Sequence, residues 1–363
     1  MRHFILIAFL SVVTSQAAQA QGCVAIRSTG TSSTMQTPHH DQSKWQFNAN
    51  YRYFKSFRHF KGKEEQEERV EQGTDVRNFS HALDLSIIRQ FNNRFSMAVN
   101  LPLLANRRSS LYEHGLVNGV YVKKERHSTS SYGVGDMRVS AYYWLLNPMK
   151  SMKGNIQLGA GIKVATGDYN YKDYWWNVGP NGSKELRTVD QSIQLGDGGT
   201  GFTVEMNSFY SLTSSLSIYA NAFYLINPRD VNGTRTYRET LSPVLANEDI
   251  MSVPDQFMAR AGFNYMKGRW AFTGGVRVDG VPVYDLVGLS SAFRRPGYVV
   301  AVEPGLSYQK GRNLFYLNVP VAVVRNRTQS VTDKEMTEQS GTYRQGDAAF
   351  ADYVINLGYS VKF

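Results

Sequence analysis

The sequence predicts an all-β protein, a transmembrane antiparallel up-and-down β-barrel of about twelve strands. Three observations predict this fold: apolar and polar residues alternate with a period of two, tight turns alternate with long loops, and charge within the strands is almost confined to one face. Hydrophobic residues make up 42% of the chain, which has 22 Tyr, 19 Phe and 31 Gly. That composition suits many short, half-buried strands better than a helical core.

The first twenty residues have the features of a secretory signal peptide. Arg2 and His3 form a polar start, Phe4 to Val13 an apolar stretch, and Ala18 to Ala20 a small-x-small cleavage site. No later apolar stretch reaches the roughly 18 residues that a membrane helix needs. We therefore expect an exported protein without a helical anchor.

Residues 21–43 are rich in Ser, Thr and Gln and are predicted to form a mobile periplasmic leader before a barrel that spans residues 44–363. The leader holds the single cysteine, Cys23. The segment from Ala20 to Cys23 fits a lipoprotein box poorly, because that pattern prefers Leu first and a small residue second. The run His39-His40-Asp41 is more typical of solvated residues than of a metal site, and no cofactor is predicted.

Twelve segments carry the period-two pattern. In the last segment, every second residue from Tyr353 to Phe363 is apolar or aromatic. The residues between them are small or polar apart from Val354. The predicted strands are Trp45–Lys55, Arg77–Gln90, Phe95–Leu104, Tyr132–Leu146, Asn155–Thr166, Gly201–Leu212, Leu216–Asn227, Phe257–Met266, Trp270–Asp279, Tyr298–Gln309, Leu314–Val324 and Tyr353–Phe363.

Five tight turns and six long loops join these strands in strict alternation. Outer-membrane barrels combine short periplasmic turns with long external loops, whereas a soluble sandwich has no reason to do so. An even number of strands then places both termini on the periplasmic side. The long loops are residues 56–76, 105–131, 167–199, 228–256, 281–296 and 325–351.

The two faces of the strands decide the class of barrel. A Lys or Arg that faces lipid at mid-depth costs about 2–4 kcal/mol, and the predicted outward face has almost no charge away from strand ends. A soluble barrel would show the reverse. Buried charges must be paired or hydrated, so a wet lumen is expected. The predicted lumen-lining charges are Arg52, Asp84, Asp136, Arg138, Lys163, Glu205, Arg260, Arg277, Asp279 and Glu303.

The end of the chain resembles the terminal assembly signal of bacterial outer-membrane barrels, which closes on Phe and carries aromatic residues at alternate positions upstream. Tyr359, Val361 and Phe363 occupy those positions. The resemblance implies insertion by the barrel-assembly machinery, with outer-membrane lipid around the barrel.

Several short motifs resemble the MetA-pathway phenol-degradation family of outer-membrane proteins. Gly133-Val134-Gly135-Asp136 is similar to its Gly-x-Gly-Asp signature, and Lys163 to Asp168 is similar to its Lys-Leu-Pro-Thr-Gly-Asp, with Ala165 in place of Pro. Asn100 to Pro102 and Gln194 to Gly199 also fit its layout. The resemblance implies transport of small, often hydrophobic compounds. The segments Cys23–Arg27 and Tyr51–Phe60 resemble uncharacterised barrels of Bacteroidota.

The first functional hypothesis is a channel for passive passage of small compounds. Five basic and five acidic lumen residues favour salt-bridged bands over strong ion selectivity; the alternative is that these charges only pair with one another and leave no path. The longest loop contains five aromatic residues: Tyr169, Tyr171, Tyr174, Trp175 and Trp176. They are expected to form either an apolar collection site at the external mouth, or an aromatic girdle or packed loop.

Two other hypotheses stay open. The first is a structural or adhesive barrel that acts through its external loops. The second is a lipid hydrolase built on His81, which is predicted to face outward; since Ser96 on the next strand is predicted to face inward, no serine faces His81 there, and an enzyme is not expected. The net charge of +10 is scattered without a basic stripe, so nucleic acid is not an expected partner.

Overall fold

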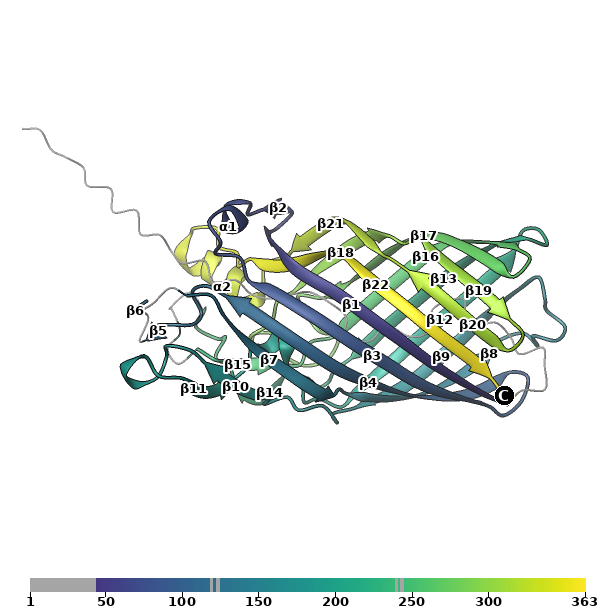
Figure 1. Ribbon diagram of the computed structural model, residues 1–363, viewed down its shortest axis with the longest axis horizontal. Coiled ribbons are helices and arrows are strands. Elements are labelled where there is room, and N and C mark those ends of the chain that lie inside the picture. The colour runs from purple at the N-terminus through teal and green to yellow at the C-terminus, as the bar shows by residue number, and fades with distance from the viewer. Residues whose placement is uncertain (1–43, 118–119, 122–124, 239–240, 242–244) are drawn as a thin grey trace, which may run out of the picture.

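The chain folds into a closed antiparallel barrel of twelve strands (Figure 1). The computed structural model describes residues 44–117, 120–121, 125–238, 241 and 245–363. Each barrel strand pairs with its neighbours in sequence, and β22 (Ala348–Lys362) returns to pair with β1 (Trp45–Lys61), which closes the sheet. The predicted fold class is therefore confirmed. The predicted signal peptide and leader, including Cys23 and His39-His40-Asp41, lie outside the described residues.

Three of the twelve barrel strands are each interrupted once, so the main sheet contains more named strands than the barrel has positions. After β1, the barrel strands are β3 (Arg77–Gln90), β4 (Phe95–Ser110), β7 (His127–Val134) with β8 (Met137–Trp144), β9 (Gly154–Val164), β12 (Gly201–Ser211), β13 (Leu216–Ile226), β16 (Gln256–Lys267), β17 (Trp270–Val281), β18 (Gly297–Val302) with β19 (Gly305–Lys310), β20 (Asn313–Asn318) with β21 (Val321–Arg327), and β22.

Two of the interruptions coincide with prolines, which cannot donate a hydrogen bond to the neighbouring strand. Pro304 separates β18 from β19, and Pro320 separates β20 from β21. Neighbouring strands stay hydrogen-bonded at these interruptions. Val319 N–H donates to the Pro304 carbonyl and Val354 N–H donates to the Pro320 carbonyl, both at 3.0 Å. The third interruption lies at Gly135, whose N–H donates to the Pro102 carbonyl at 2.8 Å.

Several strands extend further toward the long loops than the alternation predicts. In residues 105–110 and 127–131 most side chains on both faces are polar, and in residues 348–351 both faces carry Ala or Phe, so the period-two signal fades although backbone pairing continues. The predicted limits Lys55, Leu104, Tyr132 and Tyr353 are corrected to Lys61, Ser110, His127 and Ala348.

The long loops also contain short regular elements that the sequence analysis treated as irregular. The helix α2 is capped reciprocally by Ser330 and Asp333, and it ends at Gly341, whose φ of 64° favours glycine. The added elements are β2 (Glu64–Glu65), α1 (Glu68–Glu71), β5 (Leu116–Val117), β6 (Val120–Tyr121), β10 (Lys172–Trp175), η2 (Pro180–Gly182), β11 (Glu185–Thr188), η3 (Gln191–Ile193), β14 (Val231–Arg235), β15 (Ile250–Ser252) and α2 (Val331–Ser340).

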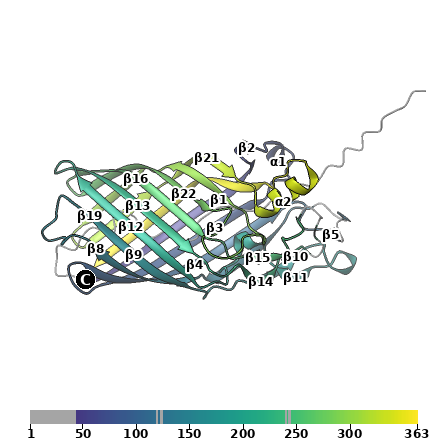
Figure 2. The same cartoon turned by 180° about the vertical axis from the view of Figure 1, so that it is seen from behind.

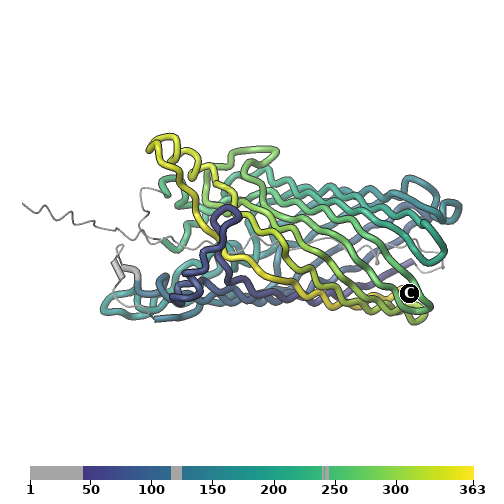
Figure 3. The backbone as a smooth tube through the Cα atoms, turned by 90° about the horizontal axis from the view of Figure 1, so that it is seen from above, coloured from purple at the N-terminus to yellow at the C-terminus, as the bar shows by residue number. Residues whose placement is uncertain are grey.

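The two ends of the barrel differ strongly. The short hairpin turns gather around the C-terminus, whereas the long loops with α1 and α2 gather at the opposite end (Figures 1 and 2). The strands run obliquely to the long axis of the barrel (Figure 3). Trp45 and Phe363 exchange two backbone hydrogen bonds of 2.9 Å, so β1 begins beside the C-terminus. Within the described residues no helix is long and apolar enough to cross a membrane.

The two faces of the barrel wall have opposite chemistry. On β9, Ile156, Leu158 and Ile162 are exposed on the outside, whereas Asn155 and Gln157 are buried inside. This partition recurs around the wall: large apolar side chains are exposed outside and polar side chains are enclosed. The outer surface is therefore suited to hydrocarbon, and the pairing of β22 with β1 removes the open edges of the described sheet apart from β7, which pairs with β4 alone.

A charge placed in the middle of the outer belt tests this partition. Ala160 is the central member of the five outward residues of β9, and Ala160→Arg should destabilise the barrel folded in lipid vesicles by about 2–4 kcal/mol. Ala105→Arg is the matched control, because Ala105 lies next to Arg107 at the end of the belt and should cost about 0–1 kcal/mol. Urea titration of the vesicle-bound protein measures both; equal costs would contradict the membrane-facing assignment.

Candidate functional site

The ten predicted lumen charges lie at inward positions of the wall, where their side chains are buried or half-buried. Eight of them pair with another member of the set. The ion pairs are Arg52–Asp84 at 3.6 Å, Arg138–Glu205 at 3.9 Å, Arg260–Glu303 at 3.2 Å and Arg277–Asp279 at 2.6 Å.

The other two, Asp136 and Lys163, bind the loop that follows β9. Lys163 forms an ion pair with Asp197. Asp136 accepts hydrogen bonds from the backbone N–H groups of Gly167 and Asp197, both at 3.0 Å. Asp197 was not among the predicted site residues, because it belongs to a loop without periodicity. It anchors the base of this loop to the inner wall.

Aromatic side chains accompany the charges across the barrel interior. The hydroxyl of Tyr142 donates to Glu205 Oε2 at 3.1 Å, and the Arg138 guanidinium lies 5.1 Å from the ring centre of Phe223. The ring of Tyr142 lies over Gly159, where an added Cβ would be only 2.7 Å from it. The glycine therefore provides the space that lets this tyrosine reach its carboxylate.

The interior toward the short turns is filled by neutral polar side chains that bond to one another. Gln46 donates to Asn48 at 2.8 Å, and Asn221 donates to Asn207 at 2.7 Å. Arg260 Nε joins this region to the charged band by donating to Asn221 at 3.0 Å. The interior at this end is therefore polar and hydrogen-bonded, unlike an apolar core.

At the opposite end, the longest loop folds back into the mouth of the barrel. The carbonyls of Ser252 and Phe293 both accept from the Gln191 side-chain amide at 3.1 Å, so the loop is tied across the mouth to two other loops. Leu195 is buried and packs on Ala82 and Leu104 of the wall.

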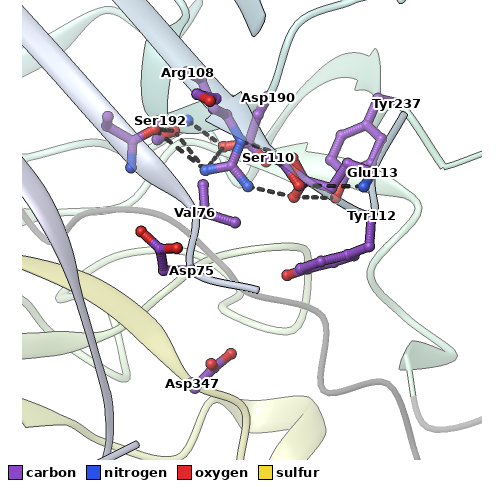
Figure 4. A network of polar contacts seen from close by, with 12 residues as sticks. Asp75, Val76, Arg108, Ser110, Tyr112, Glu113, Asp190, Ser192, Tyr237 and Asp347 are labelled. Carbon is purple, nitrogen blue, oxygen red and sulfur yellow. Dashed lines mark hydrogen bonds and ion pairs between the residues drawn. The ribbon is translucent and has the colours of Figure 1, made fainter. Parts of the chain in front are cut away.

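A buried ionic cluster fixes this loop, and Figure 4 shows its part around Arg108, Glu113 and Asp190. Arg295, from the loop before β18, donates to both carboxylate oxygens of Asp190 at 2.9 and 2.6 Å. Arg108, near the end of β4, lies 3.7 Å from Asp190 and donates to Glu113 at 2.5 Å. Tyr237 OH also donates to Glu113, at 2.9 Å. We call the pair Asp190–Arg295 the mouth latch.

The mouth latch is electrostatically strong at neutral pH. Burial by itself raises the pKa of Asp190, but the neighbouring guanidiniums of Arg108 and Arg295 outweigh burial and hold that pKa well below its ordinary range. Asp190 therefore stays ionised under all ordinary conditions. Removing the carboxylate would leave Arg295 buried without its anion and Arg108 with Glu113 alone.

Two of the five predicted loop aromatics form a packed layer. Trp175 is buried and stacks on Tyr237 with ring centres 4.4 Å apart, while Trp176 stacks on His127 at 4.6 Å. His114 lies 5.1 Å from Trp175. Burial lowers the pKa of His114 to about 3, with additional repulsion from His127 and Arg108. The layer is thus a packed part of the loops.

The other three loop aromatics are separate from this layer. Tyr171 packs near Leu195 and lies 6.1 Å from the ring of Tyr132, Tyr169 lies against Gly198, and Tyr174 is exposed. The structure therefore does not bring the five aromatics together into one collecting surface.

Among the described residues, one cavity of about 100 Å³ and another of about 50 Å³ lie beneath the folded loop. Both are large enough for several water molecules. The larger one touches Arg52, Asn78, Gln191 and Arg295. The smaller one is lined by polar and apolar residues together: Asn100, Asp136, Arg138, Lys163, Asp197, Thr203 and Gln256, and Pro102, Leu104, Leu195, Phe223 and Leu225.

A second buried cluster secures the seam where the barrel closes. His59 Nδ1 lies 3.0 Å from Asp347 Oδ2, and His59 Nε2 accepts from Val76 N–H at 2.9 Å. Arg69 donates to the same Asp347 oxygen at 2.6 Å. Its arginine and histidine partners outweigh burial and lower the pKa of Asp347. The cluster connects β1, α1 and the segment before β22.

The remaining predicted residues lie on the outer face. Tyr359 OH donates to Asn313 at 2.6 Å, and Phe363 is exposed at the end of the chain. Val361 pairs with Phe47 in the closing register. His81 is exposed, and its Nδ1 lies 2.7 Å from Tyr51 OH; a serine does not occupy that position.

Comparison with known proteins defines the class of fold. No family model matches the chain, and no curated protein matches it, so the resemblance of its motifs to the phenol-degradation family stays a prediction. An outer membrane channel from Pseudomonas putida has a similar structure, with a TM-score of 0.57 and 11% identity over 93% of this chain and 100% of that chain. At this identity the similarity shows the fold alone: a barrel of the bacterial outer-membrane type.

Two further structures are more distant. The toluene transporter TodX from Pseudomonas putida has a TM-score of 0.44 and 10% identity over 94% of this chain and 96% of that chain. The translocator domain of the autotransporter NalP from Neisseria meningitidis has a TM-score of 0.44 and 9% identity over 90% of each chain. Similarity at this level adds nothing to the argument.

The aromatic layer should loosen in acid. Folded His114, with a pKa of about 3, stays neutral where an unfolded histidine, with a pKa of about 6.5, takes up a proton. The open form therefore binds more protons, and opening becomes more favourable as the pH falls from about 6.5 toward 3. His114→Gln, which keeps an acceptor for Trp176 N–H, should flatten this dependence. Limited proteolysis of the loops against pH measures it; an unchanged slope would contradict the assignment.

Proposed function

We propose that this protein is a channel of the bacterial outer membrane that allows passive passage of small compounds. The observation that carries the proposal is a closed barrel with an apolar exterior, an ion-paired polar interior and water-sized cavities beneath a loop that closes the mouth. A purely structural barrel would have no need of cavities with hydrogen-bonding walls. The predicted signal peptide agrees with export to that membrane.

The charges of the interior favour weak ion selectivity. Four ion pairs neutralise eight of the ten predicted lumen residues, and Lys163 is neutralised by Asp197. A pore with balanced rings of charge repels neither sign strongly. Neutral or weakly charged small solutes are therefore the expected cargo.

The smaller cavity supports solutes with an apolar part. Its lining includes Leu195 and Phe223 as well as Asn100 and Arg138, so it offers both hydrocarbon contact and hydrogen bonds. This combination fits the small, often hydrophobic compounds that the family resemblance implies.

The proposal includes three partners. Outer-membrane lipid would surround the exposed belt, the barrel-assembly machinery would recognise the terminal strand through Tyr359, Val361 and Phe363, and a small solute would occupy the lumen. Residues 1–20 would direct export, and residues 21–43 would lie in the periplasm.

Breaking the mouth latch should open the channel. Asp190→Ala leaves Arg295 and Arg108 buried without their shared carboxylate, a change that costs about 3–5 kcal/mol when a buried pair is broken. The loop should then leave the mouth more often, and the mean conductance in planar bilayers should rise several-fold above that of the wild type.

A neighbouring ion pair provides the matched control. Arg294 and Asp285 form an equally buried pair in the external loops, but they do not tie the longest loop across the mouth. Asp285→Ala should therefore leave the conductance unchanged. Silence of the wild type and of Asp190→Ala at every voltage would contradict the channel, and equal opening by both variants would contradict the latch.

A further inference from the structure

The loop between β17 and β18 presents an unusual set of exposed apolar side chains. Within residues 284–289, Tyr284 is 57% exposed, Leu286 65%, Val287 50% and Leu289 68%. Val276, an outward residue of β17, is 52% exposed. The side chains of these loop residues are therefore about as exposed as those of the apolar belt. Clustered exposure of this kind marks a contact surface. We call residues 284–289 the apolar finger.

The apolar finger is held in place by a buried ion pair at its base. Arg294 donates to both oxygens of Asp285 at 2.7 and 2.6 Å, and both side chains are almost completely buried. Asp285 also accepts from Asp255 N–H at 2.9 Å, and Leu286 N–H donates to Asp255 Oδ2 at 2.9 Å. The only charged residue of the finger is thus turned inward and paired, which leaves an uncharged tip.

The tip is bound to the segment that follows β13. Leu289 N–H donates to Asp230 Oδ1 at 2.5 Å. Gly288 has a φ of 91°, and an added Cβ would lie 2.1 Å from that same oxygen, so only glycine fits there. The finger therefore runs from the end of β17, past the start of β16, to the end of β13.

The finger lies on the outer side of the wall. Asp255, which binds its base, accepts a hydrogen bond from Tyr224 OH at 3.1 Å. Tyr224 shares the outward face of β13 and pairs with Val204, which is exposed on the outside. The inward neighbours Phe223 and Leu225 are buried on the other side of the same strand. The exposed side chains of the finger thus continue the apolar belt toward the external loops.

We infer that the apolar finger inserts among the acyl chains of the outer leaflet and extends the lipid-facing belt on one side of the barrel. Continuity with the belt and the absence of outward charge at residues 284–289 favour lipid over a protein partner. Tyr284 marks the water-facing edge, because Lys334 Nζ lies 4.6 Å from its ring centre and 3.3 Å from its hydroxyl. Tyrosine is enriched at membrane–water interfaces, where its ring contacts hydrocarbon and its hydroxyl reaches water. This inference rests on the proposed outer-membrane location.

Lipid contact of single labelled sites tests the inference. In a Cys23→Ser background, the variants Leu286→Cys, Val276→Cys and Leu186→Cys are each labelled with an environment-sensitive fluorophore and folded into vesicles with or without brominated phosphatidylcholine. Val276 reports the belt, and Leu186 is an exposed apolar residue of another loop. We expect the labels at 286 and 276 to lose most of their emission in brominated lipid and the label at 186 to lose little.

The outcomes separate the inference from the proposed location. If 276 is quenched while 286 behaves like 186, the finger is not in the membrane although the barrel is. If neither 276 nor 286 is quenched, the location itself is wrong. Energy transfer between labels at 286 on different molecules, without lipid quenching, would assign the finger to a second copy and overturn the inference.

Weakening the base provides a second, independent measurement. Asp285→Asn removes the ionic anchor but leaves the apolar side chains of the finger in place. Lipid quenching of the label at 286 should then fall toward the value at 186, while the label at 276 should not change. Undiminished quenching would show that the buried pair does not hold the finger at the membrane.

Discussion

The hydrogen-bonded pairing of β22 with β1 is the constraint on which the rest of this structure depends. It runs from Gln46–Lys362 to Phe60–Ala348 and turns a twisted sheet into a closed ring. Once the ring is closed, the side chains of every strand point alternately to the outside and into the lumen. The His59–Asp347–Arg69 cluster stabilises this seam at the end where the loops begin.

Closure makes charge pairing inside the barrel necessary. A carboxylate or guanidinium in a narrow lumen is partly desolvated, so it needs an opposite charge or water. The wall supplies most of these partners itself, but Lys163 and Arg295 obtain theirs from the longest loop through Asp197 and Asp190. These two ion pairs neutralise interior charges and also hold the longest loop across the mouth. This links the composition of the wall to the position of the longest loop.

The sequence predicts the wall well, because a strand with one face in lipid must alternate at every step. The strand from Arg77 to Gln90 has the predicted limits, and the closed barrel has the predicted twelve strands. The sequence does not predict which loop enters the mouth. Asp190, Asp197 and Arg295 lie in segments without periodicity, and their partners are more than thirty residues away in the chain. Trp175 likewise becomes buried through a stacking partner, Tyr237, that no local pattern identifies.

The most direct test of the account compares two adjacent residues of β4 by the accessibility of spin labels in a lipid bilayer. Val99 is exposed on the outer face, whereas Asn100 lines the smaller inner cavity. In a Cys23→Ser background, a label at Val99→Cys should collide with oxygen dissolved in the lipid and not with a water-soluble nickel complex. A label at Asn100→Cys should show the opposite preference. The same preference at both sites, or the reverse order, would contradict a barrel with lipid outside and water within.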